Sequence, residues 1–552
     1  MKKLSLFLLL NLLLNPVYSQ EISPVLQNDQ KPALVVGIVV DQMRYDYLTR
    51  FWDKYEEGGF KRIIGEGFNF KNAHFNYIPT YTAPGHASVF TGTTPQNHGI
   101  IGNDWYNKFE KKSVYNAGDD KVQPVGTSSD AGKMSPHRML STTVADENRL
   151  FTQMRGKTIG IAMKDRGAIL PAGHTANAAY WFQGKDEGKW ITSSFYMKDL
   201  PGWVKDFNRS GKAASYLKVW NTLYDINTYN ESGPDKNNFE GGFNNQTTFP
   251  YDLEKLSGGK NKFEMVKVSP YGNNLTTDFA IAAIDAEALG QDEFTDFLTL
   301  SYSSTDYIGH NFGVNSKEIQ DTYLRLDQDL TRLLNHLDEK VGEGKYTIFL
   351  TSDHGGGDVP SYMSSVRIPG GYFDNTGFKE KLNSFIEEHY DESNLIEMVS
   401  NYQIFFNYKA LLDADIRAED LETTLAHFIL QYPQVSNVYT RTQMQGGSFT
   451  RGTSALVQNG FNQKRSGDVI MVLKPSVITY SETGSTHGSG FSYDTHAPML
   501  FYGTGIPQGS SLEKAEIIDI APTVSALLGI SNPNAATGKP LKVMLEKVER
   551  DN

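Results

Sequence analysis

Six side chains with metal-binding chemistry stand at widely separated places in this sequence. Three are aspartates that follow apolar runs, and three are histidines near two of those aspartates or in a glycine-rich turn: Asp41, Asp306, Asp353, His310, His354 and His487. Singly, an aspartate at the end of a strand is more often a loop cap than a ligand. As a set, these side chains match the oxygen and nitrogen ligands of two zinc ions. Two metals about 3.5–4 Å apart can stabilise both the attacking and the leaving oxygen of an in-line displacement.

The stretch around Thr82 offers a hydroxyl that could attack at such a centre. Pro84 suits the first turn of a helix over residues 83–91, so Thr82 is predicted at the cap position just before it. Thr is a common N-cap, and the isolated pattern therefore favours a structural role. Helix N-termini also bind anions, and coordination by a metal lowers the pKa of a hydroxyl. Beside the predicted metal ligands, Thr82 becomes the candidate nucleophile and a candidate metal contact.

Apolar runs indicate the elements that must bring these residues together. They are typical of strands buried on both faces of a parallel sheet, and they cover residues 33–40, 297–302, 346–350 and 499–502. Helices are expected within 316–341, from its apolar stripe, and at 519–528. The predicted fold class is α/β: a doubly wound, mostly parallel central sheet with helices on both faces. Ligands bind outside the carboxyl ends of such strands, where the three aspartates stand.

Two long segments interrupt this alternation and are interpreted as insertions in one catalytic domain over residues 20–552. Residues 104–290 are rich in Gly, Asn, Tyr and Trp and lack strong periodicity, which suggests a cover over the active-site end of the sheet. Residues 355–485 suggest a small α+β insertion, βαβ-like, with strand, helix and strand at 402–407, 417–431 and 435–440. Within it, residues 446–460 are expected to be loop.

The first residues have the character of a secretory signal peptide. Lys2 and Lys3 precede an apolar run over residues 4–14, and cleavage is expected after Ser19, so residues 1–19 are assigned to the signal. The expected location is the periplasm, with the extracellular medium as the alternative. No later stretch reaches the ~18 apolar residues of a membrane span. The chain has no cysteine, which excludes disulfides and thiolate metal sites, and its net charge of −12 argues against nucleic acid as a partner.

Taken together, these motifs resemble the alkaline phosphatase superfamily. The resemblance rests on residues 81–86 (YTAPGH) followed by Thr91-Gly92, and on the pairs Asp306 with His310 and Asp353 with His354. Within the superfamily the chain is similar to the threonine-nucleophile branch, which includes nucleotide pyrophosphatases/phosphodiesterases. It is most similar to the flavobacterial, phosphate-irrepressible type of alkaline phosphatase. The resemblance runs from residues 39–44 to the C-terminal helix, and it implies an alkaline phosphatase-like fold.

The same resemblance implies how two zinc ions are held in each chain. Each ion would have its own ligand set: Asp306, His310 and His487 for one, and Asp41, Asp353 and His354 for the other. Thr82 would bind the second ion before it attacks phosphorus. The implied reaction passes through a phosphothreonine intermediate, which is then hydrolysed. His496 is a weaker alternative to His487 as a ligand, and because it closely precedes a predicted strand, a packing or supporting role is favoured for it.

Three further residues match catalytic positions of the superfamily. Asn103 matches an asparagine that hydrogen-bonds a non-bridging phosphoryl oxygen. Lys164 and Arg166 match a cationic pair carried by the members that hydrolyse phosphate monoesters. An ammonium and a fork-shaped guanidinium suit a dianionic phosphoryl group. Without the resemblance, the stretch Lys164–Arg166 would be interpreted as a solvated charge cluster.

The leading hypothesis is therefore an exported, monomeric zinc phosphatase that hydrolyses small phosphate monoesters. A phosphodiesterase or nucleotide pyrophosphatase with the same metals and nucleophile is the nearest alternative, and Lys164 and Arg166 argue against it. A sulfatase would need Cys or Ser at position 82 and Arg where His86 stands. A non-catalytic protein that captures phosphate would not need a nucleophilic hydroxyl beside its metals.

Overall fold

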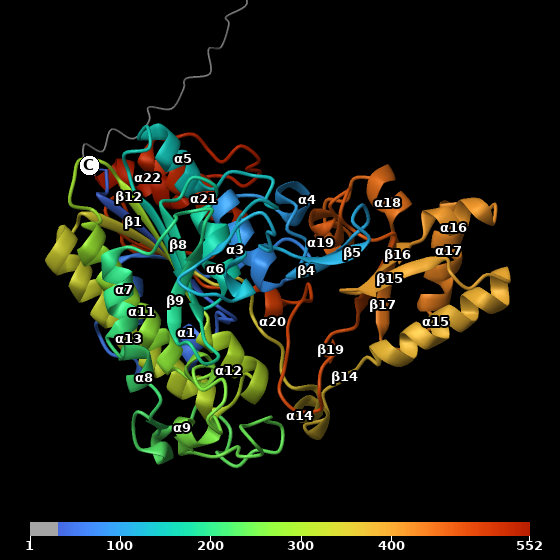
Figure 1. Ribbon diagram of the computed structural model, residues 1–552, viewed down its shortest axis with the longest axis horizontal. Helices are drawn as coiled ribbons and strands as arrows, with labels where there is room; N and C mark the ends of the chain where they lie inside the picture. The colour runs from blue at the N-terminus through green and yellow to red at the C-terminus, as the bar shows by residue number, and fades with distance from the viewer. Residues whose placement is uncertain (1–30, 552) are drawn as a thin grey trace, which may run out of the picture.

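The computed structural model describes residues 31–551, so the predicted signal peptide lies outside the described residues. A large body is built around a ten-stranded sheet, and a smaller lobe projects from one side of it (Figure 1). In spatial order the strands are β21 (Gly509–Ser511), β2 (Phe68–Phe70), β20 (Met499–Gly503), β13 (Tyr346–Thr351), β1 (Leu34–Val40), β12 (Asp296–Tyr302), β7 (Thr158–Ala162), β8 (Ala178–Gln183), β9 (Lys189–Ser193) and β6 (Pro124–Val125).

The middle of this sheet is parallel, and its flanks contain antiparallel pairs together with the parallel pair of β2 and β21. Strands β13, β1, β12, β7 and β8 run in one direction. Strand β20 is antiparallel to β13, and β9 is antiparallel to β8. The predicted α/β fold with a large central sheet is confirmed. The fourth predicted strand, 499–502, joins the sheet as the antiparallel β20.

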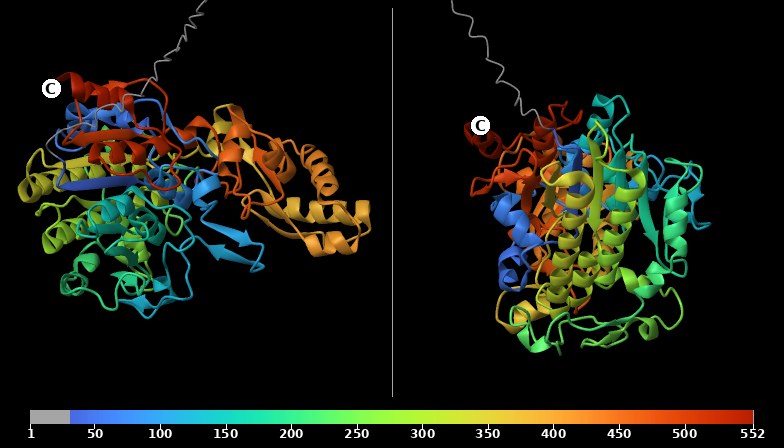
Figure 2. Two further views of the ribbon diagram at one scale, coloured as in Figure 1. Left: turned by 90° about the horizontal axis from the view of Figure 1, so that it is seen from above. Right: turned by 90° about the vertical axis from the view of Figure 1, so that its left-hand side faces the viewer.

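Strand β1 shows why a continuous apolar run marks the centre of the sheet. Its even-numbered residues, such as Val36 and Ile38, pack with α11 (Tyr271–Glu287) and α13 (Lys317–Leu337). Val35 and Val39 point to the opposite face and pack with α3 (Thr82–Thr91), α5 (Val144–Phe151) and α21 (Ile520–Leu528). Both faces are covered, so every residue of the strand is buried. In the right-hand view of Figure 2, the yellow-green α11 and α13 lie together on one face.

The central parallel strands end at the same edge of the sheet. The register pairs Val40 of β1 with Tyr302 of β12 and Val39 with Thr351 of β13. Ser301 of β12 pairs with Ala162 of β7. The segments that follow these strands therefore emerge side by side, and they carry most of the predicted site residues.

The expectation that residues 104–290 form only a cover is wrong. This segment supplies β6 to β9 of the central sheet, and its helices α5, α6 (Asp165–Ala172) and α11 pack on the sheet. The strand β7 is only five residues long and contains Gly160. A Cβ at Gly160 would lie 2.3 Å from the carbonyl oxygen of Ala168, so the glycine permits close packing of α6. A short run interrupted by glycine gives a weak strand signal, which is why the sequence did not reveal it.

The smaller lobe has its own antiparallel sheet and its own apolar core. The sheet order is β15 (Ile396–Ser400), β16 (Gln403–Phe406), β18 (Val469–Leu473) and β17 (Val435–Thr440). Helices α15 (Asn375–Tyr390), α16 (Tyr408–Asp413) and α17 (Ala418–Ile429) contribute to this core. The predicted strand, helix and strand correspond to β16, α17 and β17, and β18 lies between the two strands. The left-hand view of Figure 2 shows the orange lobe beside the body.

The loop expected at 446–460 is wrong for most of its length. Residues Gly452–Gly460 form α19, which follows α18 (Arg441–Gly446). Glycines at both ends of α19 and few large apolar residues within it hid the helical pattern. Ala455 and Val457 nevertheless provide a buried side to this helix.

Short elements complete the chain between these larger ones. The helices are α1 (Tyr47–Arg50), α2 (Phe60–Glu66), α4 (Pro95–His98), α7 (Gly202–Arg209), α8 (Lys212–Ser215), α9 (Leu253–Leu256), α10 (Glu264–Lys267), α12 (Ser304–Phe312), α14 (Pro360–Ser365), α20 (Ser492–Thr495) and α22 (Lys542–Asp551). The strands are β3 (Ala73–His74), β4 (Asp104–Asn107), β5 (Lys112–Tyr115), β10 (Val219–Trp220), β11 (Tyr251–Asp252), β14 (Gly371–Tyr372), β19 (Val477–Ile478) and β22 (Ala515–Glu516). Within residues 31–551, none of the helices has the length and apolarity that a membrane crossing requires.

Candidate active site

The carboxyl edge of the parallel strands gathers the predicted metal ligands. Asp41 directly follows β1, and Asp353 with His354 follows β13. Asp306 and His310 lie one turn apart on α12, which follows β12, so both side chains point to the same side of that helix. The fourth segment is the loop that carries His487. All six side chains come together at this edge.

Two groups of ligand atoms lie close enough to hold metal ions. Within each group the atoms lie within 4.8 Å of one another: Asp306, His310 and His487 in one group, and Asp41, Asp306 and His354 in the other. The first group is the set that the resemblance implied. The second contains Asp306 where Asp353 was expected, yet Oδ2 of Asp353 lies 3.5 Å from Nε2 of His354. Asp353 therefore borders the second group.

The three histidines are held in one tautomer by the backbone. Each places Nδ1 against a carbonyl oxygen: His310 at 2.7 Å from Ser485, His354 at 2.9 Å from Gly355 and His487 at 2.7 Å from Thr80. A carbonyl oxygen only accepts hydrogen bonds, so Nδ1 carries the proton in each ring. The lone pair of each neutral ring is then on Nε2. This arrangement orients histidines for metal binding.

Unpartnered buried atoms test whether these residues fit a metal. Oδ1 of Asp41, Oδ2 of Asp353 and Nε2 of His354 are buried, and no described residue donates a hydrogen bond to any of them. Nε2 of His354 lies 3.6 Å from Oδ1 of Asp41. Buried acceptors without partners are costly. Two carboxylate oxygens and an imidazole nitrogen are a donor set that zinc accepts, so the site fits the metal.

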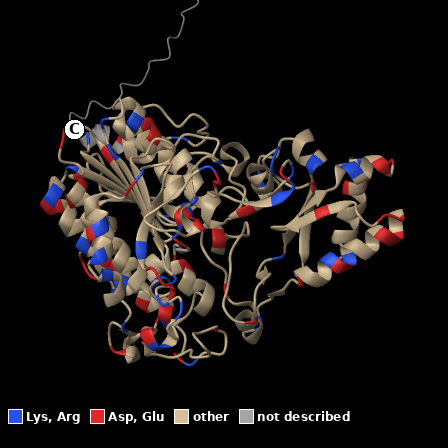
Figure 3. Ribbon diagram, viewed as in Figure 1, with Lys and Arg blue, Asp and Glu red and all other residues tan. Residues whose placement is uncertain are grey.

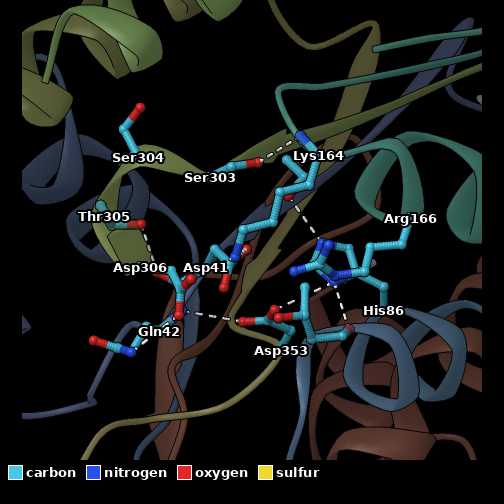
Figure 4. A network of polar contacts seen from close by, with 12 residues as sticks. Asp41, Gln42, His86, Lys164, Arg166, Ser303, Ser304, Thr305, Asp306 and Asp353 are labelled. Carbon is cyan, nitrogen blue, oxygen red and sulfur yellow. Dashed lines mark hydrogen bonds and ion pairs between the residues drawn. The ribbon is translucent and has the colours of Figure 1, made fainter. Parts of the chain in front are cut away.

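Lys164 occupies a position that the sequence did not predict. Figure 4 shows its side chain extended to Asp41 and Asp306. Nζ lies 2.7 Å from Oδ2 of Asp41 and donates a hydrogen bond of 2.5 Å to Oδ2 of Asp306. Strand β7 pairs in parallel with β12, so the residues that follow the two strands lie side by side and Lys164 is placed next to Asp306. The ammonium therefore offsets part of the negative charge of two predicted metal ligands.

A chain of hydrogen bonds through Tyr115 to Asp165 holds the side chain of Arg166 in place. Its Nη1 donates to the hydroxyl of Tyr115 at 3.1 Å, and that hydroxyl donates to Oδ1 of Asp165 at 2.5 Å. Nε of Arg166 is buried and has no hydrogen-bond partner among the described residues. The guanidinium thus keeps donor capacity for another acceptor.

Burial and close charges shift the pKa values of these groups. Burial, followed by the charge of Asp353, raises the pKa of Asp41 well above its usual range. Burial would also raise the pKa of Asp306, but His310 and Lys164 outweigh it and leave that pKa well below the usual range. For Lys164, burial opposes the charged form, yet Asp306 and Asp41 raise its pKa above the ordinary value.

Thr82 lies at the start of α3, between Thr80, whose carbonyl oxygen is 2.7 Å from Nδ1 of His487, and His86, whose Nδ1 is 3.3 Å from Oδ2 of Asp353. Asn103 holds the first turn of this helix. The expectation that Thr82 caps the helix is wrong, because the helix begins at Thr82 and Tyr81 occupies the cap position. No described residue forms a hydrogen bond with the Thr82 hydroxyl. Oδ1 of Asn103 accepts from the backbone nitrogen of Ala83 at 2.9 Å, which leaves the Asn103 amide group free to donate.

Gln42 and His86 support the centre and were not predicted as site residues. Gln42 donates from Nε2 to Asp306 at 3.0 Å and from its backbone nitrogen to Asp353 at 3.1 Å. Nδ1 of His86 lies 3.3 Å from Oδ2 of Asp353, and its Nε2 lies 2.8 Å from Oγ of Ser301. The only sequence signal for this contact is the place of His86 one turn after Thr82.

His496 lies apart from both metal groups. It stacks between Tyr45 and His74, with ring centroids 4.5 and 4.7 Å away. Its Nε2 lies 3.0 Å from the carbonyl oxygen of Lys71. This ring therefore has a packing role, and the alternative of His496 as a ligand is not supported.

Comparisons with known proteins agree with this geometry. Residues 35–497 match the family described as type I phosphodiesterase / nucleotide pyrophosphatase. The chain is 45% identical over 517 residues to alkaline phosphatase PafA of Elizabethkingia meningoseptica, covering 93% of this chain and 94% of the relative. It is 42% identical over 523 residues to alkaline phosphatase PhoV of Synechococcus elongatus, covering 94% of each chain.

The fold also agrees with that of a solved structure over nearly the whole chain. The crystal structure of wild-type PafA superposes with a TM-score of 0.90 at 44% sequence identity, covering 93% of this chain and 99% of that chain. The likeness spans both the body and the lobe, since it covers nearly the whole chain. The chain therefore belongs to the type I phosphodiesterase / nucleotide pyrophosphatase family and is a hydrolase of the alkaline phosphatase type.

Proposed function

We propose that this chain hydrolyses phosphate monoesters with two zinc ions and with Thr82 as the nucleophile. The observation that carries the proposal is the convergence of three aspartates and three Nδ1-protonated histidines beside a hydroxyl with no hydrogen-bond partner among the described residues. A structural threonine would use that hydroxyl as a helix cap, whereas α3 is capped at the preceding residue.

Two ligand sets are proposed for the two ions: Asp306, His310 and His487, and Asp41, Asp353 and His354. The unpartnered atoms of Asp41, Asp353 and His354 support the second set. Zinc supplies a Lewis acid that stabilises negative charge on oxygen and lowers the pKa of a coordinated hydroxyl. Thr82 is proposed as an additional contact of the second set.

The proposed reaction has two displacements at phosphorus. In the first, Oγ of Thr82 loses its proton and forms a bond to phosphorus while the bond to the leaving oxygen breaks. The leaving alcohol takes up a proton as it departs. In the second, water attacks the phosphothreonine, its oxygen bonds to phosphorus, the bond to Oγ breaks, and Oγ regains a proton. Phosphate and an alcohol are the products, and Thr82 is restored.

Asn103, Lys164 and Arg166 are proposed to bind the transferred phosphoryl group. The free amide of Asn103 stands at the first turn of α3, where backbone N–H groups also favour an anion. Arg166 retains a buried Nε that has no hydrogen-bond partner among the described residues, and Lys164 carries an ammonium group beside Asp41 and Asp306. Charge-assisted hydrogen bonds from such groups are among the stronger polar interactions in proteins.

Phosphodiester or nucleotide pyrophosphate hydrolysis is the second candidate, because the matching family takes its name from those reactions. Both reactions would use the same metals and nucleophile. The cationic pair distinguishes them, since a diester carries one charge fewer and a second substituent where the pair would bind.

The partner proposed for this site is a small molecule, and the protein is proposed to act as a monomer after export to the periplasm or beyond. Acidic and basic residues are interspersed on the outer helices of both body and lobe in Figure 3. With a net charge of −12, such a surface favours small substrates over nucleic acid.

The test is a comparison of turnover on a phosphate monoester, a phosphate diester and a sulfate ester with the same aryl leaving group. Metal content is measured on the same sample by elemental analysis. The proposal expects the monoester to be hydrolysed fastest and two zinc ions per chain. Faster turnover of the diester would replace it with the phosphodiesterase alternative, and no turnover of any ester would overturn both.

A further inference from the structure

Four basic side chains line one cavity where the body meets the lobe. The cavity has a volume of about 210 Å³ and lies between the turn that joins β4 to β5 and the segment that joins α19 to β18. The β4–β5 hairpin contacts the lobe directly, since the hydroxyl of Tyr106 donates to Oε2 of Glu397 at 2.7 Å (Figure 1). None of the described residues around the cavity is acidic, and the basic and aromatic ones are Lys108, Arg138, Lys464, Arg465, Trp105 and Phe109.

Hydrogen bonds and stacking hold one wall of this cavity. Nη1 of Arg465 donates to the carbonyl oxygen of Arg138 at 2.8 Å and to that of Gly99 at 2.5 Å. The guanidinium of Arg465 lies over the ring of Trp105, 5.2 Å from the ring centroid. A guanidinium that stacks on an aromatic face has its planar set of donors fixed in direction. The positive charge at this wall is therefore held in place by the fold.

Two of the four cations have only distant carboxylates as partners. Nζ of Lys108 lies 3.6 Å from Oδ1 of Asp468, and that oxygen already accepts a hydrogen bond of 2.6 Å from Nε of Arg441. Nη1 of Arg138 lies 3.8 Å from Oε1 of Glu110. Nε of Arg138 is buried and has no hydrogen-bond partner among the described residues. A buried cation without a close counter-ion is costly, and burial lowers the pKa of Lys108 to about 8 although Asp468 opposes this change.

The other two cations have no carboxylate partner within residues 31–551. Nζ of Lys464 forms neither a hydrogen bond nor an ion pair with a described residue. No described residue accepts a hydrogen bond from Nε or Nη2 of Arg465. Burial, followed by the charge of Arg138, lowers the pKa of Arg465 to about 10. The cavity therefore combines free donors with an excess of positive charge, although the whole chain has a net charge of −12.

We propose that this cavity binds a phosphate group. A phosphate group carries about 1.5–2 negative charges and three acceptor oxygens at neutral pH, which match several cations better than one carboxylate does. Arginine donors suit the geometry of phosphate oxygens. Pockets for drug-sized ligands measure about 300–1,000 Å³, so a cavity of about 210 Å³ has room for a smaller ligand. The ligand is therefore inorganic phosphate, or a small organic phosphate whose apolar part contacts the exposed ring of Phe109.

The cavity is separate from the proposed active site but shares a wall with its support. None of the residues that line it belongs to the proposed metal ligands or to the groups that bind the transferred phosphoryl group. Trp105 packs in one apolar cluster with Ala83 and Ala87 of α3, the helix that begins at Thr82. A phosphate in this cavity therefore stabilises the hairpin that follows Asn103 without taking part in the chemistry.

The experiment measures how phosphate protects individual lysines in the mature protein as purified. Lys108 and Lys464 are labelled with an amine-reactive ester, and mass spectrometry quantifies the labelling of each over a phosphate titration and over a sodium chloride titration of equal ionic strength. Lys111 and Lys112 are the matched controls, because they lie on the same hairpin, do not line the cavity and pair with glutamates at 2.9 and 3.0 Å. We expect phosphate to protect Lys108 and Lys464 and to leave the two controls unchanged.

A second titration, with phenylphosphonate, distinguishes the two sources of the phosphate group. Its aryl group is not removed by hydrolysis of an ester, so it reports binding alone. Protection at a lower concentration than inorganic phosphate requires would identify a small organic phosphate as the ligand. Equal or weaker protection would identify inorganic phosphate.

The variant Lys464→Gln tests whether the four cations form one site. The phosphate concentration that half-protects Lys108 should rise at least about tenfold, as the loss of one charge-assisted hydrogen bond predicts, whereas Lys111→Gln should leave it unchanged. Turnover of an aryl phosphate by Lys464→Gln should equal that of the wild type, and a change would overturn the separation from the active site. Equal protection by sodium chloride, equal protection of the control lysines, or an unchanged midpoint in Lys464→Gln would overturn the phosphate site.

Discussion

Thr82 combines a buried position, a place in the first turn of α3 and a hydroxyl with no hydrogen-bond partner among the described residues. If Oγ attacks phosphorus, Thr82→Ala should reduce turnover by more than about a hundredfold while zinc content is unchanged. Stability should fall by only about 1 kcal/mol, because no cap is lost and the packing changes by little more than one methyl group. Thr82→Ser should retain part of the activity, since the hydroxyl survives. Steady-state kinetics and thermal melts measure these effects, and full activity in folded Thr82→Ala would assign Thr82 a structural role.

Lys164 and Arg166 are the two side chains expected to discriminate between phosphate monoesters and phosphate diesters. Charge-assisted hydrogen bonds contribute about 1.5–3 kcal/mol each, or about ten- to a hundredfold in rate if they form fully in the transition state. Lys164→Ala/Arg166→Ala should therefore depress kcat/KM for a monoester strongly and affect a diester with the same leaving group much less. Equal proportional losses for the two substrates would show that the pair does not discriminate. Zinc content must be measured alongside, because Lys164 also contacts Asp41 and Asp306.

A glycine in helix α3 allows the helix to lie close to the segment that follows β13. A Cβ at Gly85 would lie 2.1 Å from the carbonyl oxygen of Asp353. Gly85→Ala should therefore push α3 away from Asp353, cost about 1–3 kcal/mol and lower both zinc affinity and turnover. Gly65→Ala is the matched control, because Gly65 lies in α2 with nothing within 4 Å of the added Cβ. That change should raise stability by about 0.5–1 kcal/mol. Calorimetry and zinc titration compare the two variants, and an unaltered zinc affinity in Gly85→Ala would contradict the proposed role of this contact.

The elements that the sequence predicted well are those whose signals are local and long. The run from Val35 to Val40 is apolar apart from one glycine and has valines on both sides of it, and the stripe through Leu326 and Leu330 recurs over many turns, so β1 and α13 could be predicted from the sequence pattern. The three aspartates among the metal ligands could be predicted as well, because they stand at the ends of such runs. Strand β7 could not be predicted in this way, since its five residues are brought into the sheet by pairing with β12.

The parts of the site that escaped prediction depend on contacts between distant segments. The contact of Lys164 with Asp306 spans 142 residues, and the one between Gln42 and Asp306 spans 264 residues. Neither contact could be predicted from helical or strand periodicity, because the two residues of each are too far apart in the sequence. The backbone carbonyls that fix the histidine tautomers have no side-chain signature at all. Tertiary contact, and not residue type, gives these groups their roles.

At the scale of the whole molecule, the two proposed metals join segments from both halves of the chain. Metal bound only by the folded state adds stability by linkage, about 2.7 kcal/mol per site when free zinc is a hundredfold above Kd. Removing zinc with a chelator should therefore abolish turnover and lower the melting temperature, and zinc should restore both. Elemental analysis and scanning calorimetry of the same sample provide the measurement. Fewer than two zinc ions per active chain would contradict the proposed pair of sites.

The common edge at which β1, β12 and β13 end also sets an order of events as the chain is made. Asp41 is synthesised early, but the ligand group that contains it is completed only by His354, and the other group only by His487. The Nδ1 contact of His487 reaches back 407 residues to Thr80. A nascent chain therefore presents scattered single ligands, which hold a metal weakly, until residue 354 has been made, and the group of Asp306, His310 and His487 stays incomplete until residue 487. A catalytic centre with both metal groups can therefore form only after synthesis has passed His487. Fragments that lack the C-terminal segments cannot form it.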